Sequence, residues 1–333
     1  YFFLSFLIIL NLLIFKFHDL LSSKINIYDF PNERKVHKKK TPRIGGIYLT
    51  INLTIFLLFV SLIEIKKVPF VINFENNLFF FIIFYLVFFL GLLDDKYHLK
   101  ANNKLFVFVL IFSLITIFND GIVLNKLVFK NFDFSINLGK LSYIFTVLCF
   151  IIFINAFNMF DGINCQSTIY SIVFLSILFF LHDLNVNLIL VIIIALLNIL
   201  VLNYKDKIFL GDSGSLTLGY IISYLVINHY NSSESKIYAD EIFLLMIYPG
   251  IDMLRLFILR IFNKKNPLQA DKLHMHHYLI EKFSFKKSIS ISIFIFSFPL
   301  FLYYFLNLNY MTIIIYFFLI YLSILFFLRF RKI

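Results

Sequence analysis

The chain has 333 residues, of which 61% are hydrophobic, 15% are charged and 47 are phenylalanine. Soluble globular proteins have about half apolar and about a quarter charged residues, so this composition excludes a soluble domain and predicts an integral membrane protein. The formal net charge of +11 indicates contact with membrane surfaces and anionic ligands, and we expect no nucleic-acid partner.

Eleven apolar segments are long enough to cross, or nearly cross, about 30 Å of hydrocarbon as helices. They cover residues 1–17, 47–65, 78–93, 104–118, 141–154, 168–181, 187–202, 215–228, 242–262, 288–306 and 311–328. The first has no small-residue cleavage site, so we predict a span rather than a signal peptide. Several are short, which leaves open that one or two are broken, tilted or interfacial. We therefore predict an all-α polytopic bundle of about 10–11 transmembrane helices in a single domain, residues 1–333.

Lysine and arginine predict the orientation of this bundle. With the N-terminus outside, 24 of the 30 Lys and Arg residues fall on the inner side, as the positive-inside rule requires. This threading puts an active site on the cytoplasmic face of the cell membrane. Residues 119–140 alternate polar and apolar side chains and predict a short hairpin on the outer side.

Four aspartates lie at the same ends of the hydrophobic segments. They are Asp94, Asp95, Asp161 and Asp212. A carboxylate at the bilayer centre costs about 2.5 to 3.5 kcal/mol, so we expect all four to meet at one water-facing surface. Adjacent carboxylates at positions 94 and 95 can bind a hard cation or act as a general base, and Lys104 is among the lysines that attract an anionic ligand. A solubilising loop is the alternative for that pair.

A second polar motif ends the segment at 141–154. Asn155, Asn158, Asp161 and Gly162 recur at helical spacing, which places them near one helical face and indicates a shared water-filled cavity. A polar helix end is the alternative. Asp252, within the segment 242–262, is either a buried structural residue or a direct participant.

The sequence Gly-Asp-Ser-Gly-Ser at 211–215 precedes another apolar segment. Its small residues let the backbone approach a ligand, and Ser213 or Ser215 can cap the helix. The first N–H groups of that helix then form an anion pocket beside Asp212, a carboxylate suited to Mg²⁺. The two cysteines of the chain support neither a disulfide framework nor a cysteine-based zinc site.

Histidines and cations gather in two inner loops. On a helix His274 and His277 share a face and, with His276, can hold phosphates or shuttle protons near neutral pH; a zinc site lacks further ligands. The first inner loop either anchors anionic lipid headgroups or contacts a phosphate-bearing substrate. Its cations are Arg34, His37, Lys38, Lys39, Lys40 and Arg43.

Taken in order, these motifs resemble the polyprenyl-phosphate N-acetylhexosamine-1-phosphate transferase family, or glycosyltransferase family 4, over almost the whole chain. The matching motifs are Asp29-x-Pro31-x-x-Arg34-x-x-His37 with Pro42 and Gly45-Gly46, Asp94-Asp95, Asn155-x-x-Asn158-x-x-Asp161-Gly162, Gly211-Asp212-x-Gly214-Ser215, Pro249-x-x-Asp252 and His274-x-His276-His277. The resemblance implies transfer of a sugar 1-phosphate from a UDP-N-acetylhexosamine to polyprenyl phosphate with release of UMP. It also implies Mg²⁺, with Mn²⁺ as a substitute, and leaves room for a homodimer.

The resemblance also implies roles for individual residues. Asp212 is the Mg²⁺ ligand, with Asp94 as a further candidate, and Asp94 and Asp95 position or deprotonate the lipid phosphate. The catalytic positions are Asp94, Asp95, Asp161, His274, His276 and His277. The substrate-binding positions are Arg34, His37, Lys104, Asn155, Asn158, Gly162, Gly214 and Ser215.

The spacing His-x-His-His resembles the branch acting on UDP-N-acetylglucosamine, whereas the muramoyl-pentapeptide branch has three consecutive histidines. We therefore favour initiation of a surface glycan over lipid I synthesis. The chain departs from the family pattern at His98, at Cys165 and at Lys205 to Lys207, which bears on sugar specificity. A transporter would place its acids near the midplane in repeated halves, and a non-catalytic relative would lack a central aspartate.

Overall fold

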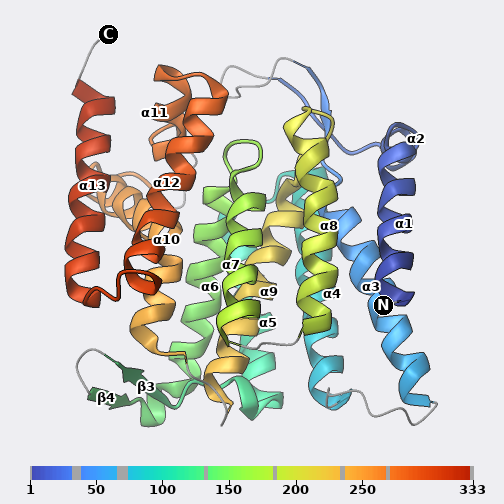
Figure 1. The fold of residues 1–333 in the computed structure, drawn as a ribbon, viewed down its shortest axis with the longest axis horizontal. Coiled ribbons are helices and arrows are strands. Elements are labelled where there is room, and N and C mark those ends of the chain that lie inside the picture. The colour runs from blue at the N-terminus through green and yellow to red at the C-terminus, as the bar shows by residue number, and fades with distance from the viewer. Residues whose placement is uncertain are drawn as a thin grey trace.

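The computed structural model describes residues 2–31, 39–65, 74–130, 134–182, 186–232, 237–267 and 271–330. Its helices stand side by side in a bundle (Figure 1). The helices are α1 Phe2–Lys16, α2 His18–Ile25, α3 Gly45–Ile65, α4 Phe74–Tyr97, α5 Ala101–Phe118, α6 Ser142–Phe160, α7 Gln166–His182, α8 Val186–Tyr204, α9 Gly211–Asn231, α10 Ala239–Phe262, α11 Met275–Lys282, α12 Phe285–Tyr304 and α13 Tyr310–Phe330. Two antiparallel pairs, β1 Tyr28–Asp29 with β2 Thr41–Pro42 and β3 Lys126–Phe129 with β4 Phe134–Asn137, and the 3₁₀ turns η1 Asp120–Ile122 and η2 Gly139–Leu141, complete it.

Each of the eleven predicted apolar segments lies on a helix. Within the described residues, eight helices are long and apolar enough to cross a membrane, and the pair α1 and α2, bent by 70°, makes up to nine. α7 is apolar but shorter. The two eight-residue helices, α2 and α11, lie at the same end of the bundle (Figure 1). The prediction of an all-α multi-pass membrane protein is confirmed.

α9 differs from the other long helices because protein surrounds it. Its side chains from Ser213 to Ile227 are all buried, and it packs against α3, α4 and α6 in the middle of the bundle (Figure 1). A helix that contacts other helices instead of lipid can carry hydroxyl side chains without exposing them to hydrocarbon. The first turn of α9 is consequently held from several sides.

Two glycines bring neighbouring helices against that first turn. A Cβ at Gly46 of α3 would lie 2.4 Å from the nitrogen of Gly214, and a Cβ at Gly91 of α4 would lie 2.5 Å from the Cα of Ser213. Neither distance leaves room for a side chain, so these contacts require glycine. The small residues that were expected to admit a ligand at 211–215 here admit the backbones of α3 and α4.

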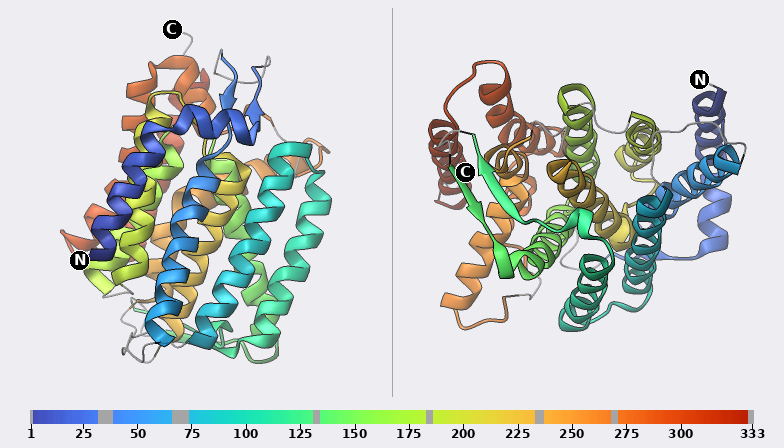
Figure 2. Two further views of the ribbon diagram at one scale, coloured as in Figure 1. Left: turned by 90° about the vertical axis from the view of Figure 1, so that its right-hand side faces the viewer. Right: turned by 90° about the horizontal axis from the view of Figure 1, so that it is seen from below.

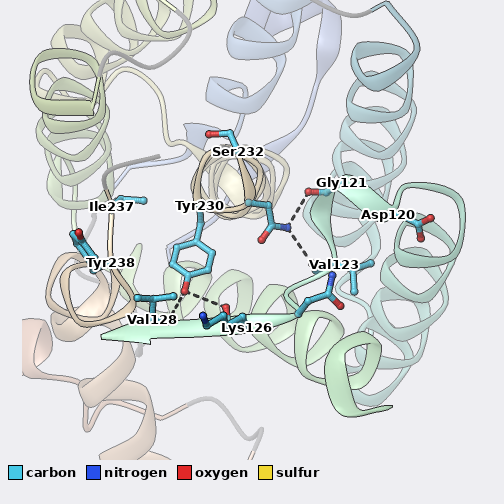
Figure 3. Close-up of a pocket in the computed structure, with 11 residues that line it drawn as sticks. Asp120, Gly121, Val123, Lys126, Val128, Tyr230, Ser232, Ile237 and Tyr238 are labelled. Atoms are coloured by element: carbon cyan, nitrogen blue, oxygen red, sulfur yellow. Dashed lines mark hydrogen bonds between the residues drawn. The ribbon is translucent and has the colours of Figure 1, made fainter. Parts of the chain in front are cut away.

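The predicted hairpin at 119–140 is present as β3 and β4, at the end of the bundle opposite α2 and α11 (Figures 1 and 2). The hydroxyl of Tyr230 accepts from the N–H of Val128 at 2.6 Å and donates to the carbonyl of Lys126 at 3.1 Å, while the amide of Asn231 donates to the carbonyl of Gly121 at 2.9 Å. These residues surround a cavity of about 460 Å³ (Figure 3). The end of α9 therefore holds the hairpin in place.

Candidate active site

The four aspartates come together at the end of the bundle that carries α2 and α11. Asp94 and Asp95 lie in the last turn of α4, Asp161 follows α6, and Asp212 lies in the first turn of α9. We call these four residues the acid cluster. Helices that run in alternate directions across the membrane bring residues far apart in sequence to one end, which is why the cluster forms.

Asp95 holds the first turn of α9. Its Oδ1 accepts the N–H of Asp212 at 2.8 Å and its Oδ2 accepts the N–H of Ser213 at 2.9 Å. The first N–H groups of α9, which were predicted to form an anion pocket for a ligand, therefore bind a protein carboxylate, as the partial positive charge of a helix N-terminus favours. Because Asp95 is fully buried, it contributes to the site by fixing the backbone of Asp212.

Asp212 is the accessible carboxylate at this helix end. Its side chain is 28% exposed, against 5% for Asp94 and 0% for Asp95. The amide nitrogen of Asn158 donates to Asp212 Oδ1 at 2.6 Å and to the Ser215 hydroxyl at 2.8 Å. One side chain of α6 thus sets the position of two residues of α9.

Asp94 and Lys104 form an ion pair between the end of α4 and the start of α5. Asp94 Oδ1 also accepts the N–H of Leu99 at 2.8 Å, so Lys104 neutralises a buried carboxylate that is already hydrogen-bonded. The turn between the two helices includes His98 with φ +52°, a left-handed conformation that histidine adopts more readily than most residues. Lys104, which was predicted to attract an anionic ligand, pairs with Asp94 in the structure.

Arg43 is a component of the site that the sequence alone does not distinguish from the other basic residues of its loop. Its guanidinium pairs with Asp29, and its Nη1 lies 3.5 Å from Asp95 Oδ1 and 4.0 Å from Asp212 Oδ2. Burial alone would lower the pKa of Arg43, but the surrounding carboxylates raise it overall, so the side chain stays charged. Its place two residues before the pair Gly45-Gly46 is the one local feature of the sequence that sets it apart from the neighbouring lysines.

Asp161 and Gly162 connect the acid cluster to the histidine motif. The Ser167 hydroxyl donates to Asp161. Burial, together with the charges of Asp212 and Asp95, raises the pKa of Asp161 to about 7, and the Ser167 bond only partly opposes this. A Cβ at Gly162 would lie 1.8 Å from Nε2 of His276, so the imidazole packs directly on the backbone after Asp161.

Asp252 anchors the histidine motif. Nδ1 of His274 donates to Asp252 Oδ2 at 2.9 Å, with the tautomer assigned from the acceptor character of the carboxylate. Asp252 Oδ1 accepts from Arg255 at 2.7 Å and from the hydroxyl of Tyr321 at 2.6 Å. Of the two readings left open for Asp252, the buried and paired structural residue is the one observed. Through His274 it fixes the start of α11.

The histidine rings lie against one another, with centroids 5.2 Å apart for His274 and His276 and 4.4 Å apart for His276 and His277. Burial and the neighbouring imidazoles lower the pKa of His276 well below its ordinary value. Burial, His274 and Lys272 lower the pKa of His277 to about 4. Both side chains are therefore neutral at pH 7, and the proton shuttling expected near neutral pH stays a prediction.

A cavity of about 940 Å³ opens beside the acid cluster. The predicted site residues that line it are Asn158, Asp161, Gly162, Asp212, Ser215 and His277. Asn155 is not among its lining residues, and its amide donates to the carbonyl of Ile151 in the same helix at 2.7 Å. The other predicted residues within the described part of the chain that are not among its lining residues are Asp94, Asp95, Lys104, Gly214, His274 and His276. Arg34 and His37 lie outside the described residues.

The donor atoms at this cavity suit one kind of metal ion. Among the described residues no three His, Cys, Asp or Glu side chains are placed to share a cation. Mg²⁺ commonly binds one or two carboxylates and takes its other ligands from water and substrate phosphates. Asp212 provides such a carboxylate at the cavity wall, so the residues present fit Mg²⁺ that is shared with a phosphate ligand.

Comparison with known proteins agrees with this arrangement. Residues 77–230 match the model of glycosyl transferase family 4. The chain is 31% identical over 265 residues to a probable undecaprenyl-phosphate N-acetylglucosaminyl 1-phosphate transferase of Bacillus subtilis, covering 77% of this chain and 70% of that protein. It is 26% identical over 269 residues to the undecaprenyl-phosphate alpha-N-acetylglucosaminyl 1-phosphate transferase of Thermotoga maritima, covering 80% and 78%. With the predicted motifs assembled at one end of a multi-pass bundle, the chain belongs to glycosyl transferase family 4, a family of enzymes that transfer sugar phosphates.

Proposed function

We propose that this enzyme transfers N-acetylglucosamine 1-phosphate from UDP-N-acetylglucosamine to undecaprenyl phosphate, forming a lipid-linked pyrophosphoryl sugar and UMP. The observation that carries the proposal is Asp212, an accessible carboxylate held by Asn158 at the wall of a cavity of about 940 Å³. The names of the B. subtilis and T. maritima relatives support the sugar and the lipid.

In this reaction an oxygen of the lipid phosphate attacks the sugar-bearing phosphorus of the donor. A new P–O bond forms, the bond to the bridging oxygen breaks, and UMP leaves with that oxygen. Mg²⁺, when bound by Asp212, supplies positive charge that offsets the repulsion between the two anionic substrates. The protein contributes position, since Asn158 orients Asp212 and Asp95 fixes the turn that carries it.

The other residues of the site bind and orient. His277 lines the cavity as a neutral imidazole, which can donate a hydrogen bond to a phosphate oxygen. Asp161, whose pKa of about 7 leaves it partly protonated at neutral pH, can do the same. The ion pair of Asp94 and Lys104 joins the last turn of α4, which also carries Asp95, to the first turn of α5.

We also propose that this end of the bundle faces the cytoplasm and that the N-terminus lies outside. The inward bias of 24 among 30 basic residues supports this orientation, and the phosphate of a polyprenyl lipid lies at the level of the acid cluster, at the membrane surface. Synthesis of this lipid-linked sugar would begin a surface glycan.

The proposal is tested with the purified protein, Mg²⁺, undecaprenyl phosphate and a panel of UDP-N-acetylhexosamines, with mass detection of the lipid product. We expect a lipid-linked N-acetylglucosamine and equimolar UMP. A product formed only from UDP-N-acetylmuramoyl pentapeptide would reassign the enzyme to lipid I synthesis, and no product from any donor would reject the proposal.

The Asp212→Asn variant tests the role of the carboxylate in the same assay. An amide is a poor Mg²⁺ ligand. Loss of a residue that only supports a metal ligand commonly costs about 10–100-fold in activity, so we expect loss of the ligand itself to cost more than about 100-fold. Thermal unfolding in detergent serves as the folding control. Near-normal turnover in this variant would remove Asp212 from the metal site.

A further inference from the structure

We propose that Arg43 is a positioning residue that acts as a resident counter-cation for Asp95 and Asp212, so that the divalent ion enters the site together with the donor pyrophosphate and not before it. This inference rests on the proposed function, because it concerns how the same cavity acquires its metal.

Three carboxylates from three different elements face one guanidinium. Arg43 pairs with Asp29 of β1, and its Nη1 lies 3.5 Å from Asp95 of α4 and 4.0 Å from Asp212 of α9. Both of the last two distances are short enough for attraction in a partly buried site, and the separation of 4.0 Å from Asp212 Oδ2 is longer than a hydrogen bond, which leaves that oxygen able to accept a ligand. Arg43 therefore compensates the charge of Asp212 without covering it.

The guanidinium is held in this place by the fold. The N–H of Arg43 donates to the carbonyl of Ile27 at 3.0 Å, and Arg43 forms a parallel bridge with Phe209, two residues before α9. Its side chain is only 12% exposed. Because the backbone is bonded on both sides and the side chain is covered, Arg43 is placed by the same segment that leads to Asp212.

This placement has a consequence for divalent ions. A cation about 4 Å from a ligand oxygen repels a second cation at that oxygen, so free Mg²⁺ or Mn²⁺ should bind weakly to the enzyme alone. The pyrophosphate of the donor brings further negative charge and further oxygen ligands. The ion is then attracted to the combined set, and metal and donor should bind with strong positive coupling.

The experiment measures Mn²⁺ binding by electron paramagnetic resonance in purified, detergent-solubilised protein, with and without UDP-N-acetylglucosamine. For the natural chain we expect weak Mn²⁺ binding that tightens by at least tenfold with donor. For Arg43→Gln we expect Mn²⁺ binding without donor to be at least tenfold tighter than in the natural chain. Arg43→Lys, which keeps the charge, should stay within about threefold of the natural chain.

Lys39 offers a matched control, because it lines the same cavity but takes part in none of the ion pairs found among the described residues. Lys39→Gln should leave the Mn²⁺ affinity within about twofold of the natural chain. Equal tightening of Mn²⁺ binding in Lys39→Gln and Arg43→Gln would show that any positive charge near the cavity repels the ion, and would overturn the inference. Asp29→Asn should change the Mn²⁺ affinity in the opposite direction. With Asp29 neutral, the charge of Arg43 is balanced only by Asp95 and Asp212, and Mn²⁺ binding should weaken.

The possible failures can be told apart. If the natural chain forms the lipid product but Arg43→Gln binds Mn²⁺ no more tightly than it, the inference fails and the proposed function stands. If the natural chain binds no Mn²⁺ even with donor and forms no product, both fail. Should Arg43→Gln unfold when purified, unchanged Mn²⁺ binding in Asp29→Asn would by itself overturn the inference.

Discussion

At the level of single residues, the role of each aspartate depends on which of its carboxylate oxygens already accept hydrogen bonds within the protein. Asp95 uses both oxygens on backbone N–H groups, and Asp94 uses its own on Lys104 and Leu99. Asp212 has one oxygen on Asn158 and the other beside the cavity. Asp94 and Asp95 are thus buried supports, whereas Asp212 and Asp161 line the cavity.

Asn158 and Asn155 form a natural pair for testing this separation. Asn158 binds Asp212, whereas Asn155 binds its own helix backbone. Because supports of a metal ligand commonly contribute about 10–100-fold, we expect Asn158→Leu to lower kcat/KM by that factor and to raise the Mg²⁺ requirement. Asn155→Leu should lose less than about threefold. Equal losses in the Mg²⁺ titrations of the two variants would contradict the assignment.

His277 predicts a pH dependence of stability. Its pKa is lowered to about 4, so the folded state binds fewer protons than the unfolded chain between about pH 6.5 and 4. The contribution of His277 is therefore fully present above about pH 6.5 and is lost as the pH falls toward 4. With solvent screening of this partly exposed ring, we expect roughly 1 kcal/mol of destabilisation by pH 5.

The measurement compares thermal unfolding of the natural chain and His277→Gln between pH 7.5 and 5. Asp161, with its raised pKa of about 7, contributes in the opposite direction, because its folded form gains protons first. The difference between the two proteins isolates His277, and it should shrink toward low pH. A constant difference would exclude the lowered pKa.

At the level of elements, polar contacts and glycines decide which helices pack together. Asn11 of α1 and Asn52 of α3 share a hydrogen bond of 2.7 Å, and Asn198 of α8 donates to Asn11 at 3.1 Å. Amides in an apolar environment favour partners on neighbouring helices. This trio fixes α1 and α8 on α3, which in turn meets the first turn of α9 at Gly46.

Gly91→Ala should disturb the site through packing alone. Its Cβ would lie 2.5 Å from Ser213 Cα and 2.7 Å from the Asp212 carbonyl, and overpacking of this kind costs about 1–3 kcal/mol. We expect a lower unfolding temperature and a reduced kcat, since α4 and the turn of Asp212 must separate. Gly250→Ala is the control, because its Cβ would meet nothing within 4 Å. A variant Gly91→Ala as stable as Gly250→Ala would refute the close contact.

At the level of the whole molecule, the bundle has two unlike ends. One carries the acid cluster, α2 and α11, and the other carries the β3 and β4 hairpin (Figures 1 and 2). Under the proposed function, the cavity must open at the membrane surface on the side where the nucleotide-sugar donor is made. The orientation of the bundle is therefore a functional property.

Cysteine labelling tests this orientation in intact cells. With Cys149→Ala and Cys165→Gly as background, the latter suited to the φ of +70° at position 165, single cysteines are placed at the exposed Ser135 and Lys205. We expect a membrane-impermeant maleimide to label position 135 directly and position 205 only after permeabilisation. The reverse pattern would invert the proposed threading.

Much of this protein was predictable from residue order. Membrane insertion, the helical segments, the hairpin and the gathering of the acids follow from hydrophobic runs, charge bias and the cost of placing a carboxylate in lipid. Those are properties of each segment in water or lipid, and they need no knowledge of its neighbours. The hairpin of β3 and β4 and the helices that contain the eleven apolar segments follow from these local properties.

The different roles of the aspartates in the acid cluster depend on the tertiary structure. Whether Asp95 binds N–H groups or a substrate, whether Asn155 or Asn158 reaches Asp212, and whether Arg43 contacts lipid or aspartates depends on distances between segments more than 50 residues apart. Such distances arise from how helices meet at glycines and buried amides. The local sequence pattern does not determine these distances. Only the assembled bundle therefore distinguishes the residues that line the cavity from those that hold them in place.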